Sequence, residues 1–481
     1  MIHKVTASVK TLKNIVYNGS PDSEVLDKLK HSHKHLHVLS LDELKALGDK
    51  HPVPPVPPQS EDLALIMYTS GSTGNPKGVM LTHGNVVANV AGCNELLGPL
   101  FNPGGVGETY LAFLPLSHIL EYSAELHEIY CGIRIGYGSV KTLTDASVRN
   151  CKGDLRELQP TLLCGVPAVW ESIRKAVESK LRSASPVVQT LFAGASSLKW
   201  ALLGWKLEYL ASPLDRLIFN SIKDQCGGKL KYAISGGAPI PKSTQQFFTT
   251  AVCKLVNGYG MTETTAGFMI QSPSQCVLLG IAGTPLISCE VKLVDVENTS
   301  YKATNIPKPQ GEVWVRGPSV MKGYYKQPQL TKEAMTEDGW LMTGDIAEAN
   351  ADGTFTIIDR KKNLVKLSNG EYIALEKLES NYKVCVYVQN ICVHADSLQS
   401  YAVALVQPVE KEIRTKASEL NLYPAEDINK IDFVELCSRK EIRASVLDSL
   451  KAVGKTVGFK GSEIIGQVFL ASEEWTPQNG M

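Results

Sequence analysis

The most constraining stretch of the sequence is residues 68–78, Tyr-Thr-Ser-Gly-Ser-Thr-Gly-Asn-Pro-Lys-Gly, which follows the apolar run 63–67 and precedes a helical apolar pattern over 86–97. The apolar run predicts a buried strand, so a strand leads into a loop of Gly, Ser and Thr. Uncovered backbone N–H groups, hydroxyls and one lysine suit a polyphosphate. The Walker A pattern is excluded, because the chain has Pro76 and Gly78 where that pattern requires Gly and Ser or Thr. A plain turn is the alternative, which the non-repeating order of polar residues disfavours.

Predicted strands and helices alternate along most of the chain. Strands are expected at 12–17, 38–39, 109–116, 133–137, 161–164, 230–234 and 254–256, and helices at 24–30, 41–47, 121–130, 154–159 and 170–181. This alternation is typical of a parallel sheet covered by helices on both faces. Ligands gather where strands of such sheets end in Gly-rich turns, and polar turns follow the strands ending near 234 and 256.

Two changes in the sequence pattern suggest the domain organisation. Residues 52–58 are Pro-Val-Pro-Pro-Val-Pro-Pro, an extended connector. From Gly311 the pattern becomes antiparallel, with strands at 312–316, 340–347 and 354–359 and a hairpin turn at 351–353. We therefore predict an α/β fold: a large N-terminal domain, 1–358, of parallel-sheet α/β layers with a small β-subdomain, then a hinge at 359–362 and a smaller, partial α+β C-terminal domain, 363–481.

Composition excludes several classes of protein. The 49 basic and 49 acidic residues balance, which argues against a general nucleic-acid footprint. The 11 cysteines are scattered without a C-x-x-C pair, so neither a zinc ribbon nor a disulfide framework is expected, and an intracellular location fits. Because no run of about 18 apolar residues occurs, we expect a soluble or peripherally bound protein.

Residues 186–211 are apolar and rich in tryptophan, yet they contain Lys199, Lys206 and Glu208. An amphipathic helical hairpin packed on the domain and a membrane-surface element both fit this composition.

Three further residues are candidates for a nucleotide site. Glu263 follows a predicted strand in a Gly- and Thr-rich turn, where it could bind Mg²⁺ together with phosphate oxygens or cap a helix. Asp345 and Arg360 lie near strand ends, where they could hold a ribose diol or pair with each other.

Six motifs in order support a resemblance. They are Tyr-Thr-Ser-Gly-Ser-Thr-Gly-Asn-Pro-Lys-Gly (68–78), Leu-Pro-Leu-Ser-His (114–118), Ser-Gly-Gly-Ala-Pro (235–239), Gly-Tyr-Gly-Met-Thr-Glu-Thr (258–264), Thr-Gly-Asp (343–345) and Asp-Arg-Lys-Lys-Asn-Leu-Val-Lys (359–366). The chain resembles the adenylate-forming (AMP-binding) acyl-CoA synthetase superfamily. Residues 166–171 and 367–372 resemble its eukaryotic long-chain fatty acid branch.

The resemblance implies an acid–thiol ligase that uses ATP, Mg²⁺ and coenzyme A. A fatty acid carboxylate attacks the α-phosphate of ATP to give acyl-AMP and pyrophosphate, and CoA then displaces AMP. Such an attack of one anion on another requires positioned cations and donors. We consider Trp170 and residues 186–211 as candidate linings for the acyl chain.

Site residues are carried over from the same resemblance. The phosphate loop matches Thr69, Ser70, Gly71, Ser72, Thr73, Gly74 and Lys77, the magnesium contacts match Thr69 and Glu263, the adenine and phosphate shell matches Gly236, Gly237, Tyr259, Gly260 and Thr262, and the ribose ligands match Asp345 and Arg360. His118 matches a position beside the acyl carboxylate, Lys362 the hinge, and Lys366 a position associated with thioester formation.

The ends of the sequence differ from the family pattern. Full-length members carry further residues before the polyproline connector, and the run ending at Met481 resembles the stretch just upstream of the family's adenylation lysine. We therefore expect a chain that is incomplete at both ends. Without that lysine, adenylation should be severely weakened and the thioester step less affected.

Alternatives remain open at this point. The chain could be a related ligase for an aromatic or short acid, or a non-catalytic remnant that binds ATP or acyl-adenylate. By resemblance, the expected partners are a long-chain fatty acid, ATP and CoA, with no nucleic acid and with peripheral contact to endoplasmic reticulum, peroxisome or lipid-droplet membranes.

Overall fold

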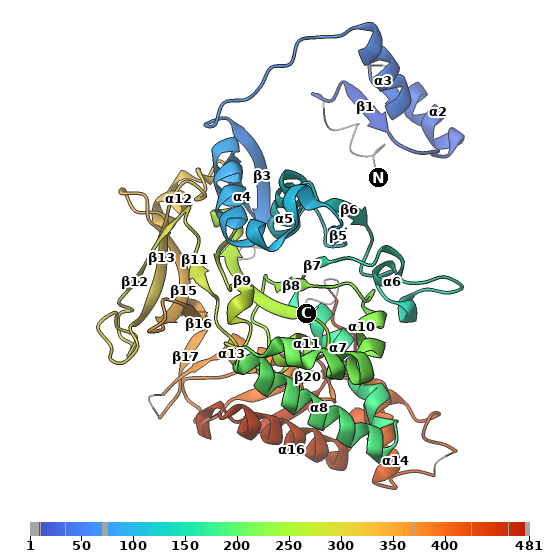
Figure 1. Ribbon diagram of the computed structural model, residues 1–481, viewed down its shortest axis with the longest axis vertical. Helices are drawn as coiled ribbons and strands as arrows, with labels where there is room; N and C mark the ends of the chain where they lie inside the picture. The colour runs from blue at the N-terminus through green and yellow to red at the C-terminus, as the bar shows by residue number, and fades with distance from the viewer. Residues whose placement is uncertain are drawn as a thin grey trace. The chain divides into compact units, whose positions relative to one another are not determined.

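The computed structural model describes residues 9, 11–33, 35–69, 76–369, 371–424, 426–459 and 461–476 (Figure 1). Its contacts divide the chain into two compact units, Met1–Gln59 and Ser60–Met481. The predicted division of the second unit at residues 359–362 stays a prediction.

The first unit is a small α/β element. It contains β1 (Asn14–Tyr17), α2 (Ser23–Ser32), β2 (His37–Ser40) and α3 (Leu41–Lys50), and the two strands pair in parallel. Leu29, Leu36 and Val38 form its core. The proline-rich connector that follows is exposed and adopts neither helix nor strand, as its composition predicts.

A seven-stranded sheet forms the centre of the second unit, with strand order β11-β10-β9-β8-β7-β5-β6. Its strands are β5 (Thr109–Ala112), β6 (Arg134–Tyr137), β7 (Leu162–Gly165), β8 (Tyr232–Ser235), β9 (Lys254–Met261), β10 (Ala266–Ile270) and β11 (Thr284–Pro285). Strands β5 to β9 are parallel, whereas β10 and β11 are antiparallel additions. The parallel α/β layer predicted from the sequence is confirmed.

Alternate residues of the central strands bury opposite faces of this sheet. In β5, Tyr110 and Ala112 belong to a cluster with Ala124 of α5, while Leu111 belongs to a cluster with Val169 of α7. Both faces are thus apolar, as expected for buried parallel strands. The helices are α4 (His83–Leu97), α5 (Ile119–Cys131), α6 (Asp154–Leu158), α7 (Pro167–Arg182), α8 (Pro186–Gly204), α9 (Ser212–Leu214), α10 (Asn220–Gln225) and α11 (Lys242–Ala251).

Two antiparallel sheets flank the central sheet. The first has the order β12-β13-β15-β16, from β12 (Glu290–Val294), β13 (Gln310–Arg316), β15 (Leu341–Ala349) and β16 (Phe355–Arg360). The second has the order β14-β4-β3, from β3 (Leu63–Thr69), β4 (Lys77–Thr82) and β14 (Gly323–Tyr324), and α12 (Pro328–Ala334) follows β14. The predicted antiparallel region and its hairpin turn at 351–353 are confirmed.

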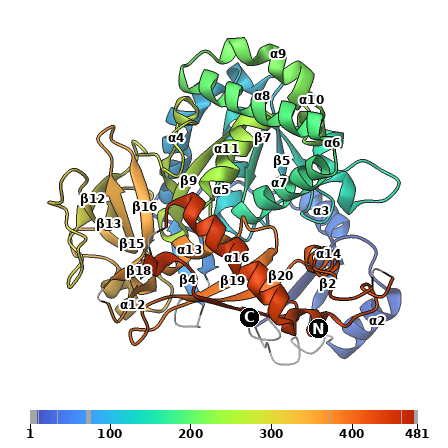
Figure 2. The ribbon, with the colours of Figure 1, turned by 90° about the horizontal axis from the view of Figure 1, so that it is seen from below.

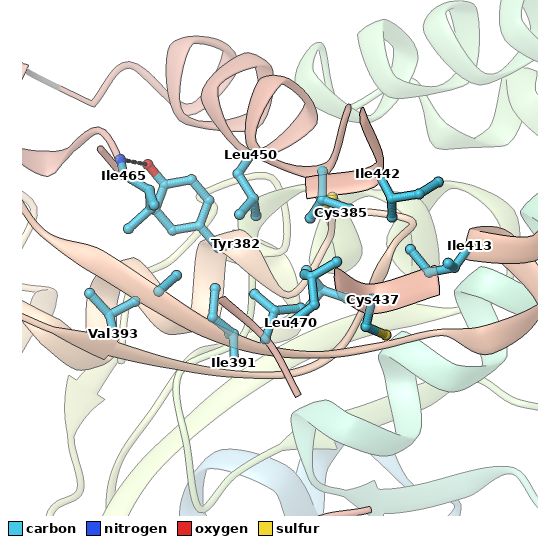
Figure 3. Packing of buried hydrophobic residues seen from close by; sticks show 14 of the residues in the cluster. Tyr382, Cys385, Ile391, Val393, Ile413, Cys437, Ile442, Leu450, Ile465 and Leu470 are labelled. Atoms are coloured by element: carbon cyan, nitrogen blue, oxygen red, sulfur yellow. Dashed lines mark hydrogen bonds between the residues drawn. The ribbon is translucent and has the colours of Figure 1, made fainter. Parts of the chain in front are cut away.

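The C-terminal part has its own hydrophobic core (Figure 3). It consists of β17 (Leu364–Lys366), β18 (Tyr372–Ala374), α13 (Leu375–Tyr382), β19 (Val388–His394), β20 (Val403–Pro408), α14 (Glu410–Glu419), α15 (Phe433–Ser438), α16 (Lys440–Val457) and β21 (Gln467–Leu470). Tyr382 is fully buried among Ile391, Leu450 and their neighbours. Its hydroxyl accepts a hydrogen bond from the Ile465 N–H at 3.3 Å (Figure 3), so a polar tip is satisfied inside this core.

Two local expectations were wrong. The helical pattern does not follow the 68–78 loop directly, because β4 intervenes and pairs with β3 as a hairpin. Strand β9 also continues through Gly258 to Met261, where a loop was expected, because these residues pair with β10.

Candidate functional site

A cleft of about 2440 Å³ brings together residues from distant parts of the second unit. The predicted site residues that line it are Thr69, Lys77, His118, Gly236, Gly237, Tyr259, Gly260, Thr262, Glu263, Asp345, Arg360 and Lys362. Lys366 does not line this cleft; its ammonium lies 5.7 Å from the ring centre of Tyr372. Ser70, Gly71, Ser72, Thr73 and Gly74 of the predicted phosphate loop lie outside the described residues.

One group of side chains lies at the end of the β3–β4 hairpin. Thr69 and Lys77 are opposite each other in its register, on either side of the predicted phosphate loop. The Lys77 ammonium lies 5.1 Å from the ring centre of Tyr324, and the Tyr324 hydroxyl donates to Oε1 of Glu263 at 2.8 Å. A cation, a hydroxyl and a carboxylate therefore meet where the loop begins and ends.

Tyr324 was not predicted from the sequence. It belongs to the two-residue strand β14, which pairs with β4, so no local pattern marks it. Burial, followed by the neighbouring Glu263 carboxylate, raises the pKa of the Tyr324 hydroxyl. The hydroxyl therefore stays protonated and acts as a donor.

Glu263 does not serve as a helix cap. In the short turn at Thr262–Thr264, the Thr264 hydroxyl binds the Met261 N–H at 3.0 Å, while the Glu263 side chain contacts Tyr324. Glu263 is buried, and the described residues make no hydrogen bond to its second oxygen. The capping alternative is therefore wrong.

A second group of side chains surrounds Asp345. The Tyr259 hydroxyl donates to Oδ2 of Asp345 at 2.6 Å, and Arg360 Nε lies 3.4 Å from Oδ1. Arg360 Nε also lies 3.8 Å from Oε1 of Glu376, a cleft residue that was not predicted from the sequence. Asp345 and Arg360 thus do pair with each other, and the pair faces the cleft.

The charge on this group depends on opposing effects. Burial raises the pKa of the Asp345 carboxyl, while the hydrogen bond from Tyr259 and the charge of Arg360 lower it. Burial also raises the pKa of Tyr259, with the Asp345 charge as the next cause. The cluster presents a carboxylate with fixed donors, an arrangement that can orient a vicinal diol.

Close backbone approach explains one of the predicted glycines. A Cβ on Gly260 would lie 1.9 Å from the carbonyl oxygen of Ala266 in the adjacent strand β10. Gly237 has a φ of +82° at the turn after β8, where a side chain would be strained. The cleft wall is therefore bare backbone at both positions.

His118 precedes α5 and acts as its N-cap. Its Nδ1 accepts from the Leu120 N–H at 3.3 Å, and the side chain is exposed to the cleft. This contact fixes the ring orientation.

A recess extends the cleft between α4, α5 and the sheet. Its lining combines the apolar Leu97, Ala124, Ile234 and Ile270 with the polar Ser123, His127 and Glu128 of α5. The candidate linings from the sequence are wrong: Trp170 is 1% exposed in the core against Phe248, and neither it nor residues 186–211 line the cleft.

The donors beside Lys77 are compatible with Mg²⁺. Glu263 supplies a carboxylate, and Thr69, which lies opposite Lys77 at the end of β3, lines the same cleft. No group of three or more His, Cys, Asp or Glu side chains suited to a metal occurs among the described residues. Mg²⁺ needs no such cage, because it binds one or two carboxylates and completes its shell with phosphate and water.

Within the described ranges, no helix is long and apolar enough to cross a membrane.

Comparison with known proteins identifies the family. The model of the AMP-binding enzyme family matches residues 2–325. The chain is 42% identical to long-chain-fatty-acid–CoA ligase 2 of Schizosaccharomyces pombe, covering 97% of this chain and 67% of that protein. It is also 42% identical to long-chain-fatty-acid–CoA ligase 1 of Saccharomyces cerevisiae, covering 97% of this chain and 65% of that protein. The chain thus spans about two thirds of the length of these relatives.

Solved structures agree on the fold. The adenylation domain of a carboxylate reductase from Mycobacterium chelonae aligns with a TM-score of 0.71 at 26% identity, covering 95% of this chain and 62% of that one. O-succinylbenzoate coenzyme A synthetase from Bacillus subtilis, solved with ATP and magnesium ion, aligns with a TM-score of 0.61 at 20% identity, covering 98% of this chain and 78% of that one. The chain belongs to the AMP-binding enzyme family, and its similar relatives are eukaryotic long-chain-fatty-acid–CoA ligases.

Proposed function

We propose that the chain carries the adenylating site of a long-chain fatty acid–CoA ligase, which converts ATP, a fatty acid and CoA into acyl-CoA, AMP and pyrophosphate. The observation that carries the proposal is that two polar groups line one cleft. Lys77, Tyr324 and Glu263 form the first, and Asp345 with Arg360 forms the second. Triphosphate at the first group and ribose at the second would place the α-phosphate between them.

The residues have complementary roles in this proposal. Lys77 offsets negative charge on the phosphates, while Asp345 accepts from ribose hydroxyls and is held in place by Tyr259. Thr69 and Glu263 would hold Mg²⁺, which neutralises phosphate charge when bound. Fixed donors and cations of this kind lower the barrier for attack by an anionic carboxylate.

The apolar side chains of the recess between α4 and α5 support a long alkyl substrate. Leu97, Ala124, Ile234 and Ile270 would cover the chain, and each buried methylene contributes about 0.8 kcal/mol to binding. His118, at the start of α5, lies on the cleft wall where the substrate carboxylate would enter.

Several finer roles stay predictions. These are Lys362 as a hinge residue, Lys366 in the thioester step, Gly236, Gly237 and Thr262 in the nucleotide shell, and peripheral contact with an organelle membrane.

The test measures substrate conversion and nucleotide binding separately. The 481-residue chain is incubated with ATP, Mg²⁺, CoA and radiolabelled palmitate, coumarate or acetate, and acyl-CoA is quantified. A second form, extended at both ends to the length of the fission yeast relative, serves as the control for chain length. Palmitate conversion by either form supports the proposal, and preference for coumarate or acetate contradicts the long-chain assignment. If ATP binds but neither form makes acyl-CoA, the binding-remnant alternative holds.

A further inference from the structure

Helix α8 carries an apolar stripe that faces solvent. Leu191 and Leu198 are seven residues apart and lie on one side of α8, and Trp205, seven residues further, caps its C-terminal end. All three are exposed. Ala195 and Leu202 follow Leu191 and Leu198 by four residues, so they lie next to them on the helix, and they are buried. Helix α8 packs on α7 and α11 (Figures 1 and 2), and the exposed stripe borders its buried face. The exposed stripe therefore has no partner among the described residues.

The segment after α8 extends this surface. Short helical turns at Glu208–Ala211 and Asp215–Phe219 both pack against α8. Tyr209 and Leu217 on this segment are exposed, with Leu217 at 82%, and Trp205 is exposed at 68%. We call Leu191, Leu198, Trp205, Tyr209 and Leu217, together with Lys206 and Arg216, the α8 surface. Large exposed apolar patches of this kind mark interaction sites.

The charge on the α8 surface is positive. Both acidic residues in the segment 205–217 are neutralised within the fold, because Glu208 pairs with Lys254 at 2.8 Å and Asp215 pairs with Lys199 and with Lys223. Lys199 is the only charged residue of α8, and it is buried.

Lys206 and Arg216 are different. Both are exposed, and neither forms an ion pair with another described residue. The surface thus combines apolar side chains, an exposed tryptophan and tyrosine, and two uncompensated cations.

We propose that the α8 surface docks on an anionic lipid membrane, with α8 lying along the interface. Helices that lie in an interface have an apolar face and basic residues beside it, and Trp and Tyr prefer the headgroup level. A second copy of the chain is a poorer occupant, because a two-fold contact would bring like charges together. The proposal does not depend on which acid the cleft activates.

Vesicle binding tests the proposal. The 481-residue chain is floated with phosphatidylcholine vesicles that contain or lack phosphatidylserine, at low and high salt. Binding should require phosphatidylserine and weaken with salt, because exposed charges are screened. Lys206→Glu with Arg216→Glu should lower the partition coefficient at least about tenfold. Trp205→Ser with Leu217→Ser should also lower it about tenfold or more.

Matched variants control for exposure and charge elsewhere on the chain. Leu398→Ser with Val434→Ser removes two exposed apolar residues from elsewhere on the chain, and Lys332→Glu with Lys411→Glu reverses two exposed charges. Both control variants should bind as the wild type does. Circular dichroism and thermal unfolding check that all variants fold.

A fluorescence measurement places the contact. Brominated lipids should quench part of the wild-type tryptophan fluorescence. The Trp205→Phe variant should still bind vesicles, but its remaining fluorescence should lack this quenchable component. Absence of binding at low salt, or equal loss in α8-surface and control variants, overturns the proposal. So does a dimer in sedimentation that the α8-surface variants convert to monomer without any vesicle binding, because the occupant is then a second copy.

Discussion

Replacing Asp345 with Asn tests whether the Asp345 group holds the ribose. Asn keeps the size of the side chain and removes its charge. The wild-type carboxylate is buried, and it has two fixed contacts, the Tyr259 hydroxyl at 2.6 Å and Arg360 Nε at 3.4 Å. Its remaining lone pairs are available to a ribose hydroxyl from the cleft.

The expected magnitude follows from the charge of the acceptor. A hydrogen bond to a charged group contributes about 1.5–3 kcal/mol, against about 0.5–1.5 kcal/mol between neutral groups. Removing the ribose hydroxyl should therefore weaken wild-type binding about 10- to 150-fold, but binding to Asp345→Asn by only about 2- to 12-fold. The two losses differ by a coupling energy of about 1–1.5 kcal/mol.

Isothermal titration of ATP, 2′-deoxy-ATP and 3′-deoxy-ATP measures this coupling. The work is done at pH 8, because burial raises the pKa of Asp345 and the carboxyl must be ionised. Glu376→Gln is the matched control, since Glu376 also lies near Arg360. If the wild type and Asp345→Asn lose the same factor in affinity for both deoxy nucleotides, the ribose assignment is refuted. If only Glu376→Gln changes that factor, Glu376 and not Asp345 binds the ribose hydroxyl.

Three further perturbations test the packing and charge of the site. Gly260→Ala should lower the free energy of unfolding by about 1–3 kcal/mol or more by overpacking the hairpin, while Gly267→Ala, whose Cβ would make only ordinary contacts, should be near neutral in the same thermal unfolding assay. Tyr324→Phe should cost about 1–3 kcal/mol, because it removes the donor to the buried Glu263; an unchanged melting temperature would contradict that role. Burial raises the pKa of Glu121 from 4.5 to about 7, so the folded state holds this proton more tightly and stability falls as pH rises from about 4.5 to about 7. Glu121→Gln cannot lose this proton, so its free energy of unfolding should fall less than that of the wild type between pH 5 and pH 8, by an amount on the order of 1–3 kcal/mol. Melting temperatures that change in parallel with pH in the two proteins would contradict this.

The sequence predicted those parts of the site that lie on locally patterned segments. Strands and Gly-rich turns could be recognised from short runs, so Glu263 could be placed just after a strand end. The expectation that Asp345 lies near a strand end was wrong, because β15 (Leu341–Ala349) continues past it and Asp345 is in the middle of that strand. Strand β4 was missed although Val79 and Leu81 alternate as a buried face, because it runs directly into α4 with no turn between them. Tyr324 could not be predicted, because its position depends on pairing between β14 and the distant β4.

The Asp345 and Arg360 pair depends on an irregularity that the hairpin turn does not reveal. Near the turn between β15 and β16, Ala347 faces Ile357. If the same register continued away from the turn, Asp345 would face Asp359. The structure instead shifts register between Ile346 and Ala347, so that Ile346 faces Asp359 and Ile358 is the extra residue.

A one-residue shift moves the following side chains to the other face of the sheet, and bulges of this kind often re-aim side chains beside active sites. Here the shift replaces an unfavourable contact between two carboxylates with the pairing of Asp345 and Arg360. The bulge, and not the residue types alone, therefore sets Asp345, in the middle of β15, opposite Arg360 at the end of β16, the arrangement suited to bind a ribose.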